Sequence, residues 1–196
     1  IDEDKKIKSK SIILATGLVD NLPKIEGLEK LYGDKIHHCP YCDSRDYWNK
    51  SIGIHGIKGA EFCLTFKSVT DNITWFSDGE PTKEEITRLT KYGIKIVNDQ
   101  INVIEKSQDD KILLNSEYIV DGLFLSLTRG QEQRSKLAEK IGLEFDKEHG
   151  IHHDGEGQTS IKGIFVAGDA SKDTLLSAMG IGEGAMVAIK CNAYLK

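Results

Sequence analysis

The sequence predicts an α/β fold, because short apolar segments that suit strands alternate along the chain with segments that suit helices. The composition agrees, since 19 glycines stand against 3 prolines, as expected of many tight turns between strands and helices. A third indication is a βαβ unit of about 30 residues, with a strand at 51–55, a helix at 60–69 and a strand at 73–76.

Length and charge exclude several classes of protein. A chain of 196 residues allows one large domain or two small ones with a substantial core. The net charge of -5 argues against nucleic acid as the main partner, because phosphate binding needs clustered positive charge. No apolar run approaches the ~20 residues of a membrane span, and the first residues carry no signal-peptide core. We expect a cytoplasmic protein without a membrane partner.

In the first half of the chain, the apolar run at 11–15 predicts a fully buried strand. Residues 18–36 are expected to form a connection with a short helix near 28–32. After the βαβ unit, a helix is expected at 82–91, where Thr82 and Glu85 have the spacing of a capping box. Gly93 is a suitable residue to end that helix.

The second half predicts short strands at 94–97, 101–105, 111–114 and 118–120, and a buried strand at 122–127. A helix at 133–140, a strand at 163–169 and a final helix at 174–194 follow. The final helix contains Gly180, Gly182 and Gly184, and each glycine costs up to about 1 kcal/mol in a helix interior. Such glycines usually permit close approach by a ligand or by another backbone segment.

The strongest chemical signal is the run Cys-Pro-Tyr-Cys at 39–42. A two-residue spacer lets the two sulfurs form an easily reduced disulfide, so that one thiol attacks an outside disulfide and the other resolves the product. A zinc site needs further ligands, and Cys63 and Cys191 are isolated in the sequence. A redox pair is the favoured interpretation, with metal binding and plain packing as alternatives.

The residues beside the pair allow more than one role. Asp43 follows Cys42 directly, where a carboxylate disfavours the thiolate but can manage a proton during dithiol chemistry. A solvated turn residue is an equally good interpretation. His37 and His38 point to opposite faces if they lie on an extended segment, so both could not join one site. Either could carry a proton near neutral pH or have a structural role.

Three segments carry a family resemblance. Residues 11–17, which end in Ala-Thr-Gly, resemble the strand that closes the first part of the FAD domain in thioredoxin reductases. The run at 38–43 resembles their redox-active loop, and Gly-Ile-Phe-Val-Ala-Gly-Asp-Ala at 163–170 is similar to their second FAD motif. The three occur in the right order and span most of the chain. The sequence therefore resembles the thioredoxin reductase-like flavoproteins of the pyridine nucleotide-disulfide oxidoreductase class.

The resemblance implies a role for each matching residue. Cys42 would exchange electrons with FAD, Cys39 would attack the partner disulfide, and Asp43 would be the general acid and base. Asp169 would hydrogen-bond the ribityl chain of FAD, and the N-terminus of the last helix, near 174–177, would lie near the flavin ring. The FAD contacts implied are Thr16, Gly17, Gly168, Asp169, Ala170, Leu176 and Ser177.

The candidate NADP turn departs from the family pattern. The fingerprint Gly-x-Gly-x-x-Gly needs its second glycine for the pyrophosphate, whereas here Gly56 takes the first position, Lys58 the second and Glu61 the third. The family also has basic residues after the next strand, whereas residues 76–80 read Phe-Ser-Asp-Gly-Glu. Gly56 and Gly59 are the candidate NADP contacts, or they simply make a tight strand-to-helix turn. We expect NADPH not to bind in the usual way.

The start of the chain is the second departure. The family's first FAD motif, a glycine-rich phosphate loop, precedes the strand at 11–17 by a long stretch, and this chain has almost nothing there. We expect a fragment, or a protein whose missing half another polypeptide supplies, and the isolated chain is expected to be colourless and inactive. The expected domains are an NAD(P)-binding-like domain at 24–124 with the cysteine pair, inserted between FAD-domain parts at 1–23 and 125–196.

The expected function is that of a flavin-dependent dithiol–disulfide oxidoreductase with FAD as cofactor. Its partner would be a thioredoxin-like protein or a small disulfide, and a homodimer is left open. One alternative is a dithiol oxidase that uses oxygen and has a non-functional NADPH site. An alternative of another class is a non-enzymatic module that binds a partner protein or a metal.

Overall fold

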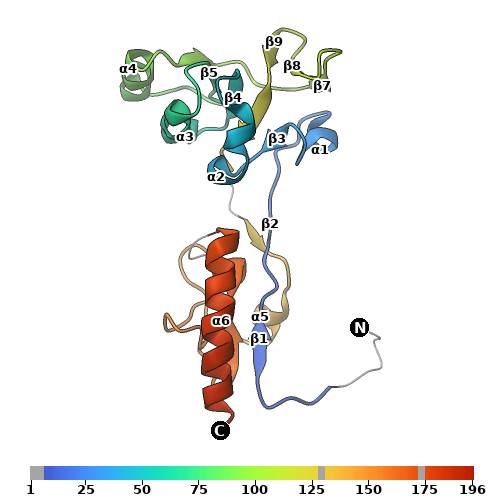
Figure 1. The fold of residues 1–196 in the computed structure, drawn as a ribbon, viewed down its shortest axis with the longest axis vertical. Coiled ribbons are helices and arrows are strands. Elements are labelled where there is room, and N and C mark those ends of the chain that lie inside the picture. The colour runs from blue at the N-terminus through green and yellow to red at the C-terminus, as the bar shows by residue number, and fades with distance from the viewer. Residues whose placement is uncertain (1–6, 128–130, 172–174) are drawn as a thin grey trace. The chain divides into compact units, whose positions relative to one another are not determined.

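The computed structural model describes residues 7–127, 131–171 and 175–196. These residues form two compact units, both drawn in Figure 1. The first, called here the split unit, contains residues 7–21, 131–171 and 175–196, and the second, the continuous unit, contains residues 22–127. These limits lie a few residues from the expected boundaries at 24 and 124.

The continuous unit is built on a sheet of five parallel strands in the order β3-β10-β4-β5-β6. Every residue of β4 and β10 is buried, as is usual for central parallel strands that are covered on both faces. The predicted α/β class is therefore confirmed. The bounds are β3 (Ile36–His37), β10 (Gly122–Leu125), β4 (Ile52–His55), β5 (Ile73–Phe76) and β6 (Lys95–Val97).

The two faces of this sheet have separate hydrophobic cores. Phe124 packs with α3 (Gly59–Thr65) and α4 (Lys83–Lys91), whereas its neighbours Leu123 and Leu125 pack with α1 (Leu28–Leu31) and an antiparallel sheet. Successive residues of a strand point to opposite faces, which explains the division. The antiparallel sheet consists of β7 (Ile104–Lys106), β8 (Ile112–Leu114) and β9 (Tyr118–Val120).

Local sequence signals account for the ends of α3 and α4. The capping box between Thr82 and Glu85 is present at the start of α4, and Gly93 adopts a left-handed conformation after its end, as predicted. The helix predicted at 60–69 ends earlier, since α3 passes into a 3-10 turn, η2 (Phe66–Ser68). Pro40 begins the four-residue helix α2 (Pro40–Asp43), which continues into the 3-10 turn η1 (Ser44–Tyr47).

The split unit pairs segments that are far apart in the sequence. Strand β1 (Ile12–Leu14) lies parallel to β12 (Ile164–Val166), and β2 (Leu18–Val19) lies antiparallel to β11 (Glu132–Gln133). The long helix α6 (Ser177–Tyr194) contacts β1 and β12. In the part of the chain that the structure describes, no helix has the length and apolarity needed to cross a bilayer.

The strand expected at 11–15 is present, but the prediction that it is fully buried is wrong. Leu14 is buried, whereas Ile12 and Ile13 are 43% and 41% exposed. Among the described residues, β1 has β12 as its neighbour on one edge and no strand on the other. The side chains of Ile12 and Ile13 are therefore partly uncovered in this structure.

The helix expected at 133–140 is present only as α5 (Leu137–Lys140). Gln133 is extended in β11, where its side chain donates to the carbonyls of His149 and Ala170. These tertiary hydrogen bonds override the local helix preference. The final helix begins at Ser177, and the part predicted at 174 lies outside the described residues.

Candidate functional site

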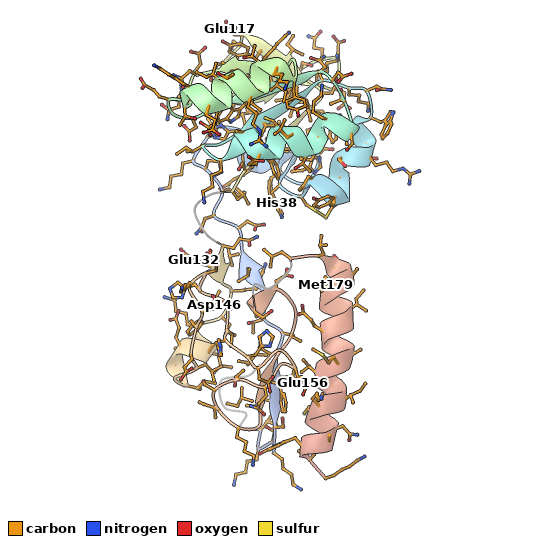
Figure 2. The ribbon with its side chains drawn as sticks, turned by 90° about the vertical axis from the view of Figure 1, so that its left-hand side faces the viewer. His38, Glu117, Glu132, Asp146, Glu156 and Met179 are labelled. Atoms are coloured by element: carbon orange, nitrogen blue, oxygen red, sulfur yellow. A yellow bond between two sulfur atoms is a disulfide. The ribbon has the colours of Figure 1, made fainter. Side chains whose placement is uncertain are left out.

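The cysteine pair lies on a short loop and helix that leave β3 at the edge of the five-stranded sheet. Cys39 is the N-cap residue of α2, and Cys42 is within that helix. Their sulfurs form a disulfide across a Cα–Cα distance of 5.4 Å. The structure thus brings the two predicted redox residues together, with His38, labelled in Figure 2, directly before them.

The two cysteines differ in their surroundings. The backbone N–H of Cys42 donates to the sulfur of Cys39 at 3.1 Å. A donor at this position stabilises negative charge on the Cys39 sulfur once the disulfide is reduced. Tyr41, between the cysteines, is 76% exposed, so the loop is accessible from solvent. Cys39 is therefore the better candidate for the attacking thiolate.

Asp43 is linked to the interior of the unit through His37. Oδ2 of Asp43 lies 3.6 Å from Nδ1 of His37, and Nε2 of His37 lies 2.8 Å from the phenol oxygen of Tyr47. The Asp43 side chain is 37% exposed, whereas His37 is buried. Burial, followed by the nearby carboxylate of Asp34, raises the pKa of Tyr47 to about 12, so the phenol keeps its proton at neutral pH.

Strand β10 anchors this arrangement. The ring of Phe124 lies 5.4 Å from that of His37 and 5.3 Å from that of Tyr47, measured between ring centres. The ring of Tyr47 also lies directly over Gly122, where an added Cβ would come within 2.1 Å of it. The reactive loop is thus fixed to a central strand of the sheet by packed aromatic rings.

The two neighbouring histidines make different contacts. His37 faces Asp43 and Tyr47, whereas Nδ1 of His38 lies 2.6 Å from the phenol oxygen of Tyr32. The side chains diverge as the sequence predicted, although His37 ends β3 and His38 lies in a bend beyond the strand. Tyr32 and Tyr47 were not predicted for this site, because nothing in their sequence spacing marks them as partners of histidines.

The split unit contains a hollow of about 280 Å³ whose walls are mostly glycine and alanine. A Cβ added to Gly17, Gly168 or Gly184 would meet nothing within 4 Å, so these residues leave space open. Gly17 and Gly168 also have positive φ angles, which favour glycine. The lining residues are Ala15, Gly17, Ala167, Gly168, Asp169, Gly180 and Gly184.

Three of the residues predicted to contact FAD, namely Gly17, Gly168 and Asp169, line this hollow. Thr16 precedes Gly17, and Leu176 and Ser177 form the start of α6. Ala170 is different, because its side chain is fully buried in the core of the split unit. Its predicted contact with FAD, through the backbone, stays a prediction, and Gly180 and Gly184 of α6 line the hollow in addition to the predicted residues.

A carboxylate that the sequence did not indicate joins α6 to this site. Oε2 of Glu183 accepts a hydrogen bond from the backbone N–H of Gly168 at 2.8 Å. Gly168 begins the 3-10 turn η3 (Gly168–Ser171), which carries Asp169. Glu183 thus holds the turn against the helix.

The glycines of the candidate NADP turn, Gly56 and Gly59, pack against other parts of the chain instead of lining a hollow. A Cβ added at Gly56 would lie 2.7 Å from the carbonyl oxygen of Ser126. A Cβ added at Gly59 would lie 2.2 Å from Nε1 of Trp75. Trp75 also donates a hydrogen bond to the carbonyl of Gly56 at 2.9 Å. The space that these glycines leave is filled by the chain itself, so their presence is explained without a ligand.

The side chains around this turn do not fit a phosphorylated dinucleotide either. Lys58 occupies the second fingerprint position, and Glu61 is tied to Arg88 in an ion pair. After β5, the side chain of Ser77 donates to the carbonyl of Gly79, and no basic residue stands in the stretch 76–80. The residues of this turn therefore do not fit NADPH.

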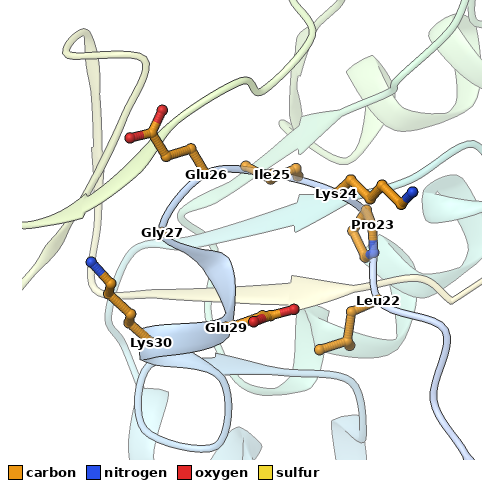
Figure 3. A pocket seen from close by; sticks show the side chains of 8 residues that line it. All are labelled: Leu22, Pro23, Lys24, Ile25, Glu26, Gly27, Glu29 and Lys30. Carbon is orange, nitrogen blue, oxygen red and sulfur yellow. The ribbon is translucent and has the colours of Figure 1, made fainter.

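A larger hollow of about 510 Å³ lies along residues 22–30, where the chain enters the continuous unit (Figure 3). Its charged residues are of mixed sign and exposed, namely Lys24, Glu26, Glu29 and Lys30. At Gly27, an added Cβ would lie 2.0 Å from the carbonyl oxygen of Ile104, so this position has no room for a side chain. The hollow contains no pair of reactive groups, so we assign no chemistry to it.

The remaining cysteines are not part of the pair. Cys63 is fully buried, and burial raises the pKa of its thiol far above the ordinary value. The sulfur of Cys191 lies 3.1 Å from Oγ of Ser11. Across residues 7–127, 131–171 and 175–196, no cluster of three or more His, Cys, Asp or Glu side chains could hold a metal ion.

Comparison with known protein families gives a match over most of the chain. The family model described as "Pyridine nucleotide-disulphide oxidoreductase" matches residues 1–190. The chain belongs to this family. Within it, the chain is thioredoxin reductase-like, as the sequence motifs indicated.

Two relatives illustrate the similarity. The "34.2 kDa protein in rubredoxin operon" of Clostridium pasteurianum is 27% identical and covers 98% of this chain and 67% of its own length. Thioredoxin reductase of Mycoplasma genitalium is also 27% identical and covers 97% of this chain and 65% of its own length. The chain thus spans about two thirds of these relatives, and 53% of a probable thioredoxin reductase of Arthroderma benhamiae.

Solved structures share the fold. An oxidoreductase from Agrobacterium tumefaciens is similar with a TM-score of 0.81 and 26% identity, over 94% of this chain and 64% of its own. Thioredoxin reductase from Streptococcus pyogenes has a TM-score of 0.85 at 20% identity, over 100% of this chain and 68% of its own. At that lower identity the likeness concerns the fold alone.

The contrast between the two sets of glycines gives a testable prediction. Gly59→Ala should lower the free energy of unfolding by about 1–3 kcal/mol, because the added methyl overlaps Trp75. Gly184→Ala, the matched control, should raise it by about 0.5–1 kcal/mol, because it removes a helix glycine without a clash. Urea unfolding followed by circular dichroism measures both, and tryptophan fluorescence reports the continuous unit, which contains Trp48 and Trp75. Unchanged stability of Gly59→Ala would mean that the turn has free space for a ligand.

Proposed function

We propose that this protein is a flavin-dependent dithiol–disulfide oxidoreductase. Electrons would pass between FAD, the Cys39/Cys42 pair and a disulfide of a thioredoxin-like protein or a small molecule. The observation that carries the proposal is the disulfide between Cys39 and Cys42 on an accessible loop, with Asp43 next to it in the chain. Family membership and relatives named thioredoxin reductase support it.

When bound, FAD supplies a two-electron acceptor and donor for the pair. We propose the hollow of the split unit as its site, because the glycines there leave room for a ligand to approach the backbone. The exposed carboxylate of Asp169 would accept a hydrogen bond from a hydroxyl of the ribityl chain. Gly17 and Gly168 would be backbone contacts, and Thr16, Leu176 and Ser177 are proposed as the neighbouring contacts.

The first exchange step belongs to Cys39. Its thiolate attacks one sulfur of the substrate disulfide, so that a bond forms between Cys39 and that sulfur while the substrate S–S bond breaks. The released substrate thiolate takes up the proton that the Asp43 carboxylate received from the Cys39 thiol, so that Asp43 is again a carboxylate. The hydrogen bond from the N–H of Cys42 supports the assignment of Cys39 as the attacking sulfur.

The second step belongs to Cys42, which is also the proposed flavin-facing thiol. The Asp43 carboxylate takes the proton of the Cys42 thiol, the resulting thiolate attacks the sulfur of Cys39 in the mixed disulfide, and the Cys39–Cys42 bond forms. The second substrate thiolate leaves and takes up that proton from Asp43. The pair has then given two electrons, and the substrate disulfide has become two thiols. Run in reverse, the same steps oxidise a substrate dithiol and reduce the pair.

These steps predict that Cys42→Ser traps a mixed disulfide. The reduced variant keeps the attacking thiol but lacks the resolving one, so a one-to-one adduct with dithiobis(nitrobenzoate) should accumulate, which intact mass spectrometry detects. Cys39→Ser should form an adduct at least about tenfold more slowly, because it lacks the stabilised thiolate. Cys63→Ser, which removes a buried thiol, is the control and should exchange like the wild type.

Equal adduct rates for Cys39→Ser and Cys42→Ser would contradict the assignment of roles. Absence of exchange in the wild type would favour a non-enzymatic module instead.

A second candidate function is that of a dithiol oxidase, in which a substrate dithiol reduces the pair and molecular oxygen finally accepts the two electrons. The packing of Gly56 and Gly59 against Ser126 and Trp75 favours it, because a protein without a fitting NADPH site needs another electron source. The acidic residues Asp78 and Glu80 after β5 agree, since they would repel a 2′-phosphate.

Anaerobic reduction of the FAD-loaded holoprotein distinguishes the two directions. We expect the yellow flavin absorbance to be bleached by a dithiol such as dithiothreitol and to be unaffected by NADPH over the same period. Readmitted oxygen should restore the colour. Rapid bleaching by stoichiometric NADPH would contradict the oxidase and favour the reductase.

A further inference from the structure

His37 is held from two sides behind the reactive loop. Its Nδ1 lies 3.6 Å from Oδ2 of Asp43, and its Nε2 lies 2.8 Å from the phenol oxygen of Tyr47. The residue is only 9% exposed, so water cannot readily replace these partners. Because both nitrogens belong to one rigid ring, a rotation that breaks one contact also disturbs the other.

The core of the continuous unit fixes this ring. His37 is the register partner of Phe124 in the pairing of β3 with β10, and the two rings are 5.4 Å apart. Tyr47 lies over Gly122, where any side chain would displace it. Of the three linked residues, His37 and Tyr47 are buried and Asp43 is partly exposed. The chain of contacts therefore runs from the core outward to the carboxylate.

The hydrogen bond between Tyr47 and His37 bears on which nitrogen of the imidazole carries a proton. Burial raises the pKa of Tyr47 to about 12, so its phenol remains protonated and can donate to Nε2 of His37. In the tautomer in which Nε2 accepts, the imidazole proton lies on Nδ1, which faces Asp43. At 3.6 Å the contact is an electrostatic attraction and not a hydrogen bond, and it still favours one orientation of the carboxylate.

We propose that His37 is a positioning residue, which holds the Asp43 carboxylate in the orientation needed for proton transfer during thiol–disulfide exchange at Cys39 and Cys42. This inference rests on the exchange function proposed above. His37 forms no bond to sulfur and transfers no electron. In each exchange step the proton still moves through Asp43 to the leaving thiolate, and the electrons still move between the sulfurs.

The length of the side chain at position 37 provides the test. In His37→Asn, the amide nitrogen can take the place of Nδ1 and keep a donor facing Asp43. In His37→Gln, the amide reaches the place of Nε2 and keeps the contact with Tyr47 instead. The measured quantity is the rate constant for exchange between the reduced full chain and oxidised glutathione, because its leaving alkyl thiolate takes up a proton at neutral pH.

We expect His37→Gln to slow exchange about tenfold or more, because a carboxylate that is not held in place transfers its proton poorly. His37→Asn should restore most of the wild-type rate. Equal rates for wild type, His37→Asn and His37→Gln would overturn the inference. A wild type that does not exchange at all would instead contradict the proposed function, so the two failures are distinguishable.

A double-mutant cycle separates positioning from a general effect on folding. In an Asp43→Asn background, His37→Gln should cause no further loss of rate, because the group that it positions is already absent. An equal loss in both backgrounds would overturn the inference. Should His37→Gln fail to fold, Tyr47→Phe replaces it in the same cycle, since it removes the phenol that orients the ring. A slowing by Tyr47→Phe that persists unchanged in the Asp43→Asn background would equally overturn the inference.

Discussion

The packing of His37 and Tyr47 against strand β10 is the interaction on which the reactive site depends. The loop with the cysteines leaves the sheet after only two residues of β3, so its own strand pairing cannot fix it. Phe124 supplies a ring surface for both aromatic residues, and Gly122 provides the space for Tyr47. Through these contacts a fully buried strand of the unit determines where Asp43 lies. The same packing keeps the hydrogen bond between His37 and Tyr47 in the interior, where hydrogen bonds are stronger than in water.

Glycine has opposite uses in the two units. In the split unit, Gly17, Gly168 and Gly184 leave space that no atom of the chain fills, which is what a ligand close to the backbone requires. In the continuous unit, Gly56 and Gly59 leave space that Ser126 and Trp75 fill. The glycines of the hollow thus leave room for a ligand, whereas those of the turn at Gly56 and Gly59 leave none. This difference supports a flavin site in the split unit and argues against an NADPH site at the turn.

Local signals in the sequence predicted some features well. The capping box at Thr82 depends on residues three positions apart, and the cysteine pair needs only a two-residue spacer, so neither requires tertiary information. The exposure of Ile12 and Ile13 could not be predicted, because an apolar run does not say how many strands flank it. Gln133 lies in a strand because its side chain donates hydrogen bonds to His149 and Ala170, which are distant in the sequence. The link between His37 and Tyr47 likewise depends on how Gly122, which is distant in sequence, receives the tyrosine ring.

We propose that the Cys39–Cys42 disulfide opens and closes during function, and its midpoint potential tests this proposal. The protein is equilibrated with buffers of reduced and oxidised dithiothreitol or glutathione, free thiols are alkylated, and the oxidised fraction is measured by mass spectrometry. We expect a midpoint potential above about −300 mV, in the range of thiol–disulfide exchange proteins. A midpoint below about −300 mV, as structural disulfides have, would contradict it.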